Sequence, residues 1–148
     1  MELKTYWGAV IFALETAKTV EELVAAALSA NKSLRGAVLS DAVLSGADLS
    51  GADLSDAVLS GKTVHSMRVF TGLYSYQVWA VVFQDGGRWV RMGCLWQSVE
   101  EWERVGIRKS NVSEFPDDGS ERCEERVAAF EFAKAAALRM KLPDPPKE

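Results

Sequence analysis

Cysteine and histidine are scarce in this sequence of 148 residues. His65 is the only histidine, and Cys94 and Cys123 are the only cysteines. Two cysteines outside a CxxC pair are too few for a disulfide scaffold, so the pattern favours a reducing cytosol. His65 has no carboxylate at a spacing that would orient a general base, and the sequence has no phosphate loop, HExxH motif or Cys/His cluster. We therefore predict a protein that is not an enzyme and that needs no cofactor and no metal.

Long apolar runs are also missing. The longest ones, such as residues 24–28 and 79–83, span only a few positions, whereas a bilayer-spanning helix needs about 18. Residues 6–14 are apolar like the core of a signal peptide, but Glu2 offsets the positive charge of Lys4 ahead of them, and Glu15 follows at once. We therefore expect a cytoplasmic protein with no membrane association.

Positive charge is not concentrated anywhere in the chain. The sequence has 17 Lys and Arg residues against 21 Asp and Glu residues, which gives a net charge of −4. Binding to phosphates or to an anionic membrane surface requires clustered Lys and Arg side chains. The charge distribution therefore predicts no direct contact with nucleic acid.

The middle of the chain contains a repeat of five residues. Serine follows most of the leucines, and the next position is always Gly or Asp. Leucine occupies Leu34, Leu39, Leu44, Leu49, Leu54 and Leu59, and alanine precedes it by two residues at Ala37, Ala42, Ala47, Ala52 and Ala57. Steps of five would spread leucine around an α-helix and would place alternate leucines on opposite faces of a strand. A flexible linker would have no reason to keep leucine in register.

A chain that turns by about 90° every five residues accounts for this period, because Gly and Asp suit the corners. Four such sides make a square coil of twenty residues, with leucine and alanine inside. The pattern resembles the pentapeptide-repeat family, whose consensus is A-x-L-S-G. Residues 47–51 match it in full, and residues 52–56 differ only at Asp56. The resemblance implies a mainly β fold with some α structure: a short right-handed quadrilateral β-helix, capped by an N-terminal helix and a C-terminal α+β module.

The outward position before each leucine divides the coil into two halves. Residues twenty apart stack in such a coil, so Val38 and Val58 should lie on one side with Val43 on the next, while Asp48 and Asp53 occupy the other two sides. An exposed valine stripe normally has a cover. We expect that cover to be the C-terminal module, or a second protomer in a homodimer or higher oligomer.

Four segments follow from these patterns. Residues 1–32 form an N-terminal cap, with a strand over 6–14 and a helix over 20–30 that begins at a capping box. Residues 33–70 form the repeat, whose last part (62–70) is a ragged final coil. Residues 71–142 form the C-terminal module, and residues 143–148 form a proline-rich tail.

The C-terminal module contains a predicted β-hairpin and two helices. Strands over 74–83 and 88–96 flank a turn at 85–87, and helices are expected over 99–105 and 120–142. The Met92-Gly93-Cys94 hairpin, the Trp102 helix and the Glu114-Phe115-Pro116 loop resemble a module found behind pentapeptide repeats in phage and prophage proteins. That resemblance implies an origin but no common activity.

The hairpin also carries the best candidate for a ligand or partner site. Trp79, Arg88, Trp89 and Arg91 combine aromatic rings with guanidinium groups, which suits an interface or a stacked nucleotide. The alternative is a hairpin core with solvated arginines. Cys94 is expected to be buried beside Met92 and Trp96.

Three functional hypotheses remain open. The first is an interaction protein that inhibits or regulates a host protein, for example as a phage anti-defence factor in the host cytosol. The second is a DNA mimic that inhibits a DNA-handling enzyme such as topoisomerase, although the repeat is short and carries few acidic residues. The third is a protein that sequesters a nucleotide or another small molecule at the Trp/Arg hairpin.

Overall fold

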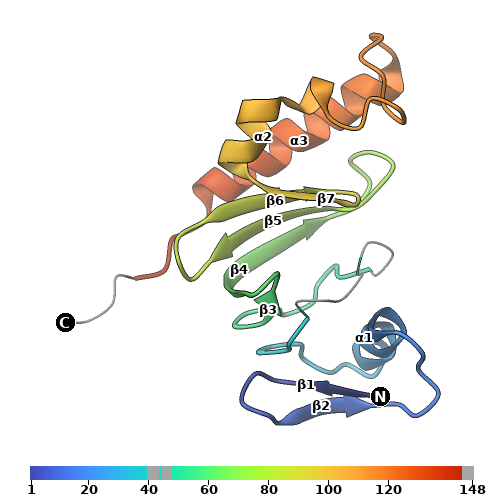
Figure 1. Ribbon diagram of the computed structural model, residues 1–148, viewed down its shortest axis with the longest axis vertical. Coiled ribbons are helices and arrows are strands. Elements are labelled where there is room, and N and C mark those ends of the chain that lie inside the picture. The colour runs from blue at the N-terminus through green and yellow to red at the C-terminus, as the bar shows by residue number, and fades with distance from the viewer. Residues whose placement is uncertain (40–43, 45–47, 145–148) are drawn as a thin grey trace.

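The computed structural model describes residues 1–39, 44 and 48–144, and its fold mixes helices and strands (Figure 1). At the N-terminal end, strands β1 (Glu2–Lys4) and β2 (Val10–Ala13) pair as an antiparallel hairpin, and helix α1 (Val20–Ser29) packs against both. The pentapeptide segment follows. No helix in the described residues has the length and apolar character needed to cross a bilayer.

The C-terminal half is an antiparallel sheet covered on one face by helices. Its five strands follow one another in chain order: β3 (Val58–Leu59), β4 (Lys62–Phe70), β5 (Val78–Phe83), β6 (Arg88–Met92) and β7 (Leu95–Ser98). Helix α2 (Val99–Val105), the short 3₁₀ helix η1 (Ile107–Lys109) and helix α3 (Glu121–Arg139) follow the sheet in the sequence. Figure 1 shows the sheet between these helices and the repeat segment.

Strand β5 separates two hydrophobic cores, and all six of its residues are buried. Successive side chains of a strand point to opposite faces. Trp79, Val81 and Phe83 accordingly join the core that contains the repeat leucines and α1. Val78, Ala80 and Val82 join the core formed with α2 and α3. The sheet therefore closes one end of the repeat segment while it holds the C-terminal helices on its other face.

The repeat leucines are buried, as the period of five predicts. Their exposed fractions lie between 0 and 4%, and Ala37 and Ala57 are fully buried beside them. Backbone bonds join positions about twenty residues apart: the Leu39 N–H donates to the Val58 carbonyl at 2.9 Å, and the Val58 N–H donates to the Ala37 carbonyl at 2.8 Å. Val38 and Val58 accordingly lie side by side in a parallel bridge. Ala42 and Ala47 lie outside the described residues.

The corners of the repeat are tight turns. At three of them the alanine N–H donates to the carbonyl of the leucine three residues earlier, at 3.0 Å, and the residue before the alanine has positive φ; these residues are Gly36, Gly51 and Asp56. The last corner differs because Ser60 and Gly61 both have positive φ, at 51° and 74°. Two successive positive φ values are typical of a type I′ turn, which joins antiparallel strands. The chain therefore reverses there into the β3–β4 hairpin.

One predicted coil is a strand, and three predicted strands are wrong in their extent, including the one expected over 74–83, which begins only at Val78. Residues 62–70 form β4 instead of a ragged coil, because Lys62–Phe70 pairs along β5 after the reversal. The strand expected over 6–14 is only β2, since the chain turns at residues 5–9, where the Ala9 N–H donates to the Thr5 hydroxyl. The strand expected over 88–96 breaks into β6 and β7 at Gly93, whose φ is +63°.

The predicted helix starts are confirmed. The Thr19 hydroxyl accepts the Glu22 N–H at 3.1 Å, and the Ser98 hydroxyl accepts the Glu101 N–H at 3.1 Å. Side-chain oxygens at this position satisfy backbone donors that have no partner within the helix. Ser120 caps α3 in the same way, by accepting the Cys123 N–H at 3.3 Å.

Replacing a leucine inside the repeat should destabilise the whole fold. Leu54→Ala removes a side chain that is 2% exposed from the core shared with β5, and we expect the free energy of unfolding to fall by about 2–5 kcal/mol. Leu138→Ala is the matched control, because Leu138 is 53% exposed on α3 and should change it by less than about 0.5 kcal/mol. Chemical denaturation followed by circular dichroism measures both. Equal effects of the two substitutions would contradict the described packing.

Candidate binding surfaces

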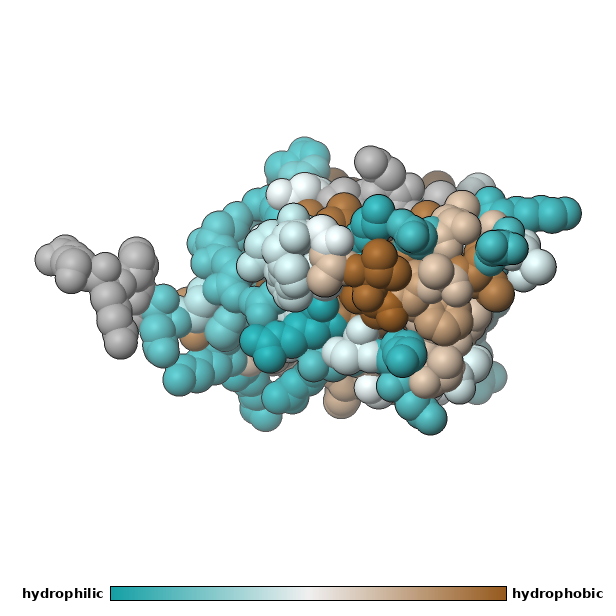
Figure 2. Space-filling model, turned by 90° about the horizontal axis from the view of Figure 1, so that it is seen from below, coloured by the Kyte–Doolittle hydropathy of each residue, from teal (hydrophilic) through white to brown (hydrophobic). Residues whose placement is uncertain are grey.

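The N-terminal hairpin and the first repeat expose large apolar side chains. Tyr6, Trp7, Val10 and Val38 have exposed fractions of 62, 57, 52 and 46%, and we call this group the N-terminal apolar surface. The rings of Tyr6 and Trp7 meet edge to face, with their centres 4.6 Å apart. Figure 2 views the molecule from the hairpin side and shows hydrophobic residues gathered in one area of that face.

Backbone bonds hold this surface onto the repeat. The Tyr6 N–H donates to the Gly36 carbonyl at 3.0 Å, and the Val38 N–H donates to the Lys4 carbonyl at 2.9 Å. The Trp7 ring lies directly over Gly36, where a β-carbon would overlap it. Two exposed aromatic residues are thus fixed in position by the first turn of the repeat.

The predicted valine stripe is only partly covered. Val58 is half-buried, and Val43 lies outside the described residues. Val38 remains 46% exposed. The expectation that the C-terminal module covers the stripe is therefore wrong for Val38, because the sheet packs at the end of the repeat and not along this side.

The two predicted aspartates are exposed, and each shapes its own turn. Asp48 Oδ1 accepts the Ser50 N–H, and Asp53 Oδ1 accepts the Ser55 N–H, both at 3.0 Å. The hydrogen bonds from Ser50 lower the pKa of the Asp48 carboxyl. These side chains are charged surface groups that also stabilise the local backbone.

The four residues predicted as one site on the hairpin lie on two faces of the sheet. Trp79, Trp89 and Arg91 face the repeat segment, where Trp89 and Trp79 also contact Trp96. Arg88 faces the other way, and its Nε donates to the Ala137 carbonyl near the end of α3 at 2.9 Å. The prediction of a common site is therefore wrong for Arg88, because Arg88 and Arg91 have opposite parity along β6.

A cavity of about 150 Å³ lies where the sheet meets the repeat. We call it the Arg91 cavity; its walls are Leu39, Leu44, Leu59, Ser60, Trp79, Arg91, Cys94 and Trp96. The Trp96 indole N–H donates to the Ser60 hydroxyl oxygen at 2.9 Å. Ser60 comes from the type I′ turn that ends the repeat.

A second cavity, of about 300 Å³, lies on the other side of the β6–β7 turn. Its walls are Tyr74, Tyr76, Met92, Gly93, Cys94, Asn111 and Glu114. It thus brings together the Met92-Gly93-Cys94 motif and Glu114, which are distant in sequence. Cys94 lines both cavities and is exposed. The prediction that it is buried is wrong, because Gly93 ends β6 before Cys94.

Two tyrosines and a glutamate form part of the wall of this second cavity. The Tyr76 hydroxyl donates to the Glu114 carboxylate, which also pairs with Arg122 at 3.3 Å. The bond from Tyr76 lowers the pKa of the Glu114 carboxyl. Burial raises the pKa of Tyr74 to about 12.

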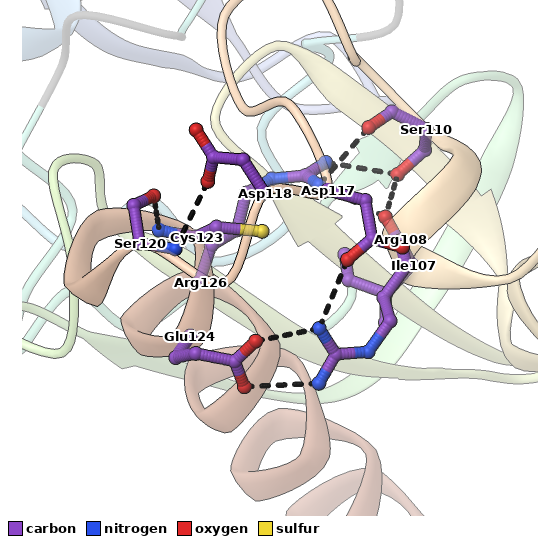
Figure 3. A network of polar contacts seen from close by, with 9 residues as sticks. All are labelled: Ile107, Arg108, Ser110, Asp117, Asp118, Ser120, Cys123, Glu124 and Arg126. Carbon is purple, nitrogen blue, oxygen red and sulfur yellow. Dashed lines mark hydrogen bonds and ion pairs between the residues drawn. The ribbon is translucent and has the colours of Figure 1, made fainter.

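Two arginines hold the loop that supplies Asn111 and Glu114 (Figure 3). Arg126 is 2% exposed, and its guanidinium donates to the carbonyls of Ile107 and Ser110 at 3.0 and 3.1 Å and to the Ser110 hydroxyl at 3.0 Å. Arg108 pairs with both oxygens of Glu124, at 2.6 and 2.9 Å. The loop is therefore fastened to the start of α3 and not left free above the sheet.

Comparison with known proteins identifies the repeat. Residues 33–61 match the family model described as "Pentapeptide repeats (8 copies)". The chain therefore contains a pentapeptide-repeat segment, as the leucine register predicts. Neither the curated proteins nor the solved structures give a match. The resemblance of the two caps to phage modules stays a prediction.

Tyr6 and Trp7 are not among the binding residues that the sequence predicts. Tyr6 and Trp7 stand before Gly8, whose φ is +91°; glycine after two aromatic residues is a turn signal. Recognising that signal would have placed both rings at the tip of a hairpin. No sequence signal distinguishes Ser60 as a binding residue, because other serines of the repeat, such as Ser50, also stand between a leucine and a glycine.

Adding a methyl group at Gly36 should disturb the N-terminal apolar surface. Gly36→Ala strains a residue with φ of +75° and displaces the Trp7 ring, whereas Gly51→Ala strains a similar φ of +73° in open space. The control should cost about 1–2 kcal/mol from backbone strain alone, and Gly36→Ala should cost more. Thermal unfolding measures both, and a shift of tryptophan emission should accompany only Gly36→Ala. Equal costs would contradict the contact between Trp7 and the repeat.

Removing the buried arginine should loosen the loop over residues 107–120. Arg126→Met removes the donor of the Ser110 carbonyl and one donor of the Ile107 carbonyl, which keeps its bonds from the Ser110 N–H and hydroxyl. We expect a loss of about 1–3 kcal/mol in the free energy of unfolding. Arg122→Met is the control, because Arg122 is exposed and its ion pair with Glu114 should contribute at most about 1 kcal/mol. Urea denaturation gives the stability, and hydrogen exchange locates the change. Exchange that is unchanged in the loop would exclude this role for Arg126.

Proposed function

We propose that this chain is a non-enzymatic binding protein that acts on a partner protein through its N-terminal apolar surface. The observation that carries the proposal is the exposure of Tyr6, Trp7, Val10 and Val38, which belong to the N-terminal hairpin and to the first repeat that is bonded to it. Tyrosine and tryptophan are enriched among the residues that dominate protein–protein binding energy. Exposed apolar patches on stable domains commonly mark interaction sites.

Strand β2 gives this surface a second means of binding. In Figure 1, β2 is the outermost strand of the hairpin, beyond β1 and the repeat. Charged side chains and proline usually protect an edge strand from pairing with another chain. Residues 7–14 contain neither. An extended segment of a partner protein could therefore add to β2 and cover the aromatic rings beside it.

We take the repeat to be a short right-handed quadrilateral β-helix, whose buried leucines support it as a rigid base for the hairpin. The resemblance to phage and prophage proteins makes the partner a protein of the host cell, and makes the host cytoplasm the place of action. Inhibition or regulation of that partner, as in an anti-defence factor, is the role we assign.

The alternative of DNA mimicry has weaker support. Asp48 and Asp53 are exposed, but Asp56 is paired with Arg35 at 3.1 Å. Duplex DNA carries one charge per ~1.7 Å of its axis. The described acidic groups of the repeat are too few to reproduce that density.

The proposal predicts that host-protein capture depends on the two aromatic residues. A pulldown from bacterial host lysate should recover a specific protein with the unmodified chain, and the double variant Tyr6→Ser/Trp7→Ser should weaken binding by at least about tenfold. Phe132→Ser/Leu138→Ser is the matched control, since these side chains are 51 and 53% exposed on α3. Thermal unfolding checks that each variant folds. Val38→Asp, which places a charge in the same surface, replaces the double variant if that one is unstable.

Three results would contradict the proposal. The first is capture that the double variant leaves intact, and the second is a clean lysate experiment without any bound protein. The third is a mass, measured by light scattering, that corresponds to a dimer and falls to the monomer value in the double variant. That outcome would assign the surface to a second copy of this chain.

A further inference from the structure

The Arg91 guanidinium is held in one position at the wall of the Arg91 cavity. Its Nε donates to the Gly93 carbonyl at 2.6 Å, and its central carbon lies 4.2 Å from the centre of the Trp79 ring. These contacts occupy one N–H group and one face of the planar group. The terminal N–H groups remain, and they are the ones that bind carboxylates in a bidentate manner.

This cation has no ion pair within the described part of the chain. Arg35 and Arg108, by comparison, pair with carboxylates at 3.1 and 2.6 Å. Arg91 is half-buried, and burial lowers its pKa from the ordinary value. A desolvated cation is costly unless an acceptor compensates for it. The cavity is the space next to Arg91 in which such an acceptor can lie.

A second donor lines the same cavity. The Ser60 oxygen already accepts the Trp96 indole N–H at 2.9 Å, so its own proton is available to a ligand. The described wall of the cavity contains no Asp or Glu side chain. The polar groups there thus favour an anionic acceptor, while Leu59 and the edge of Trp96 leave room for a small apolar part.

From this arrangement we infer that the Arg91 cavity binds a small carboxylate, with its oxygens on the Arg91 guanidinium and the Ser60 hydroxyl. The volume of about 150 Å³ corresponds to roughly five water molecules at about 30 Å³ each. A compact acid of about six non-hydrogen atoms fits that space, whereas a nucleotide does not. The site lies in a different part of the fold from the N-terminal apolar surface and does not depend on it.

Isobutyrate is a suitable probe, because it joins a carboxylate to a branched apolar group. Titration followed by ¹H–¹⁵N spectra should shift the indole N–H resonances of Trp79 and Trp96, which line the cavity, and leave that of Trp102 unchanged, because Trp102 lies in the other core. The expected Kd is on the order of 1 mM for so few atoms. Isobutyramide, which has the same shape without the charge, should bind at least tenfold more weakly.

Variants separate this site from an unspecific effect of salt. Arg91→Met should raise the Kd for isobutyrate at least tenfold, Ser60→Ala should raise it severalfold, and Arg88→Met should leave it unchanged because Arg88 faces α3. Arg91→Lys, which keeps the charge but loses the fork of donors, serves if Arg91→Met does not fold, and it too should raise the Kd. Equal binding of isobutyrate and isobutyramide, binding of phosphate or AMP in preference to isobutyrate, or an absence of any shift would each overturn the inference.

Discussion

The burial of β5 on both faces is the constraint on which the rest of the structure depends. The repeat leucines form a core that so short a segment cannot bury alone, so other elements of the chain must cover it. Trp79, Val81 and Phe83 supply the cap at one end by packing on the repeat leucines. The same strand must then be covered on its reverse side, where Val78, Ala80 and Val82 meet α3. The repeat and the C-terminal helices therefore stabilise each other through a single strand.

The transition from repeat to sheet depends on a conformational choice at one corner. The Leu-Ser-Gly sequence occurs at residues 44–46, 49–51 and 59–61, and of the two copies whose serines lie in the described part of the chain, only the one at 59–61 has its serine at positive φ. Positive φ costs a serine about 1–2 kcal/mol. The pairing of β3 and β4 after the turn, and of β4 along the length of β5, offsets that cost. Tertiary contacts, and not the local residues, thus decide where the repeat ends.

The sequence predicts correctly those features that local residues decide, and not those that tertiary contacts decide. The leucine register and the helix starts follow from local chemistry: a period of five residues, and serine or threonine hydroxyls that accept backbone N–H groups. The sequence does not predict strand β4, because Val64 and Val69 keep the spacing of five and so extend the pattern of the repeat. Arg88 and Arg91 share a residue type, but their odd separation in a strand places them on opposite faces. The Arg91 cavity needs Ser60 and β6 to meet in space, which sequence patterns alone do not reveal.

The leucine core also separates the two proposed binding sites. The hairpin with Tyr6 and Trp7 rests on the first turn of the repeat through Gly36, and the Arg91 cavity lies against its last corner through Ser60. Both sites therefore adjoin one packed core, to which the repeat leucines contribute their side chains. Close-packed interiors resist small displacements, because any void or overlap is costly. Occupation of the cavity would thus stabilise the folded state as a whole without needing to move the hairpin, so the two binding events are expected to be thermodynamically independent as long as the chain stays folded.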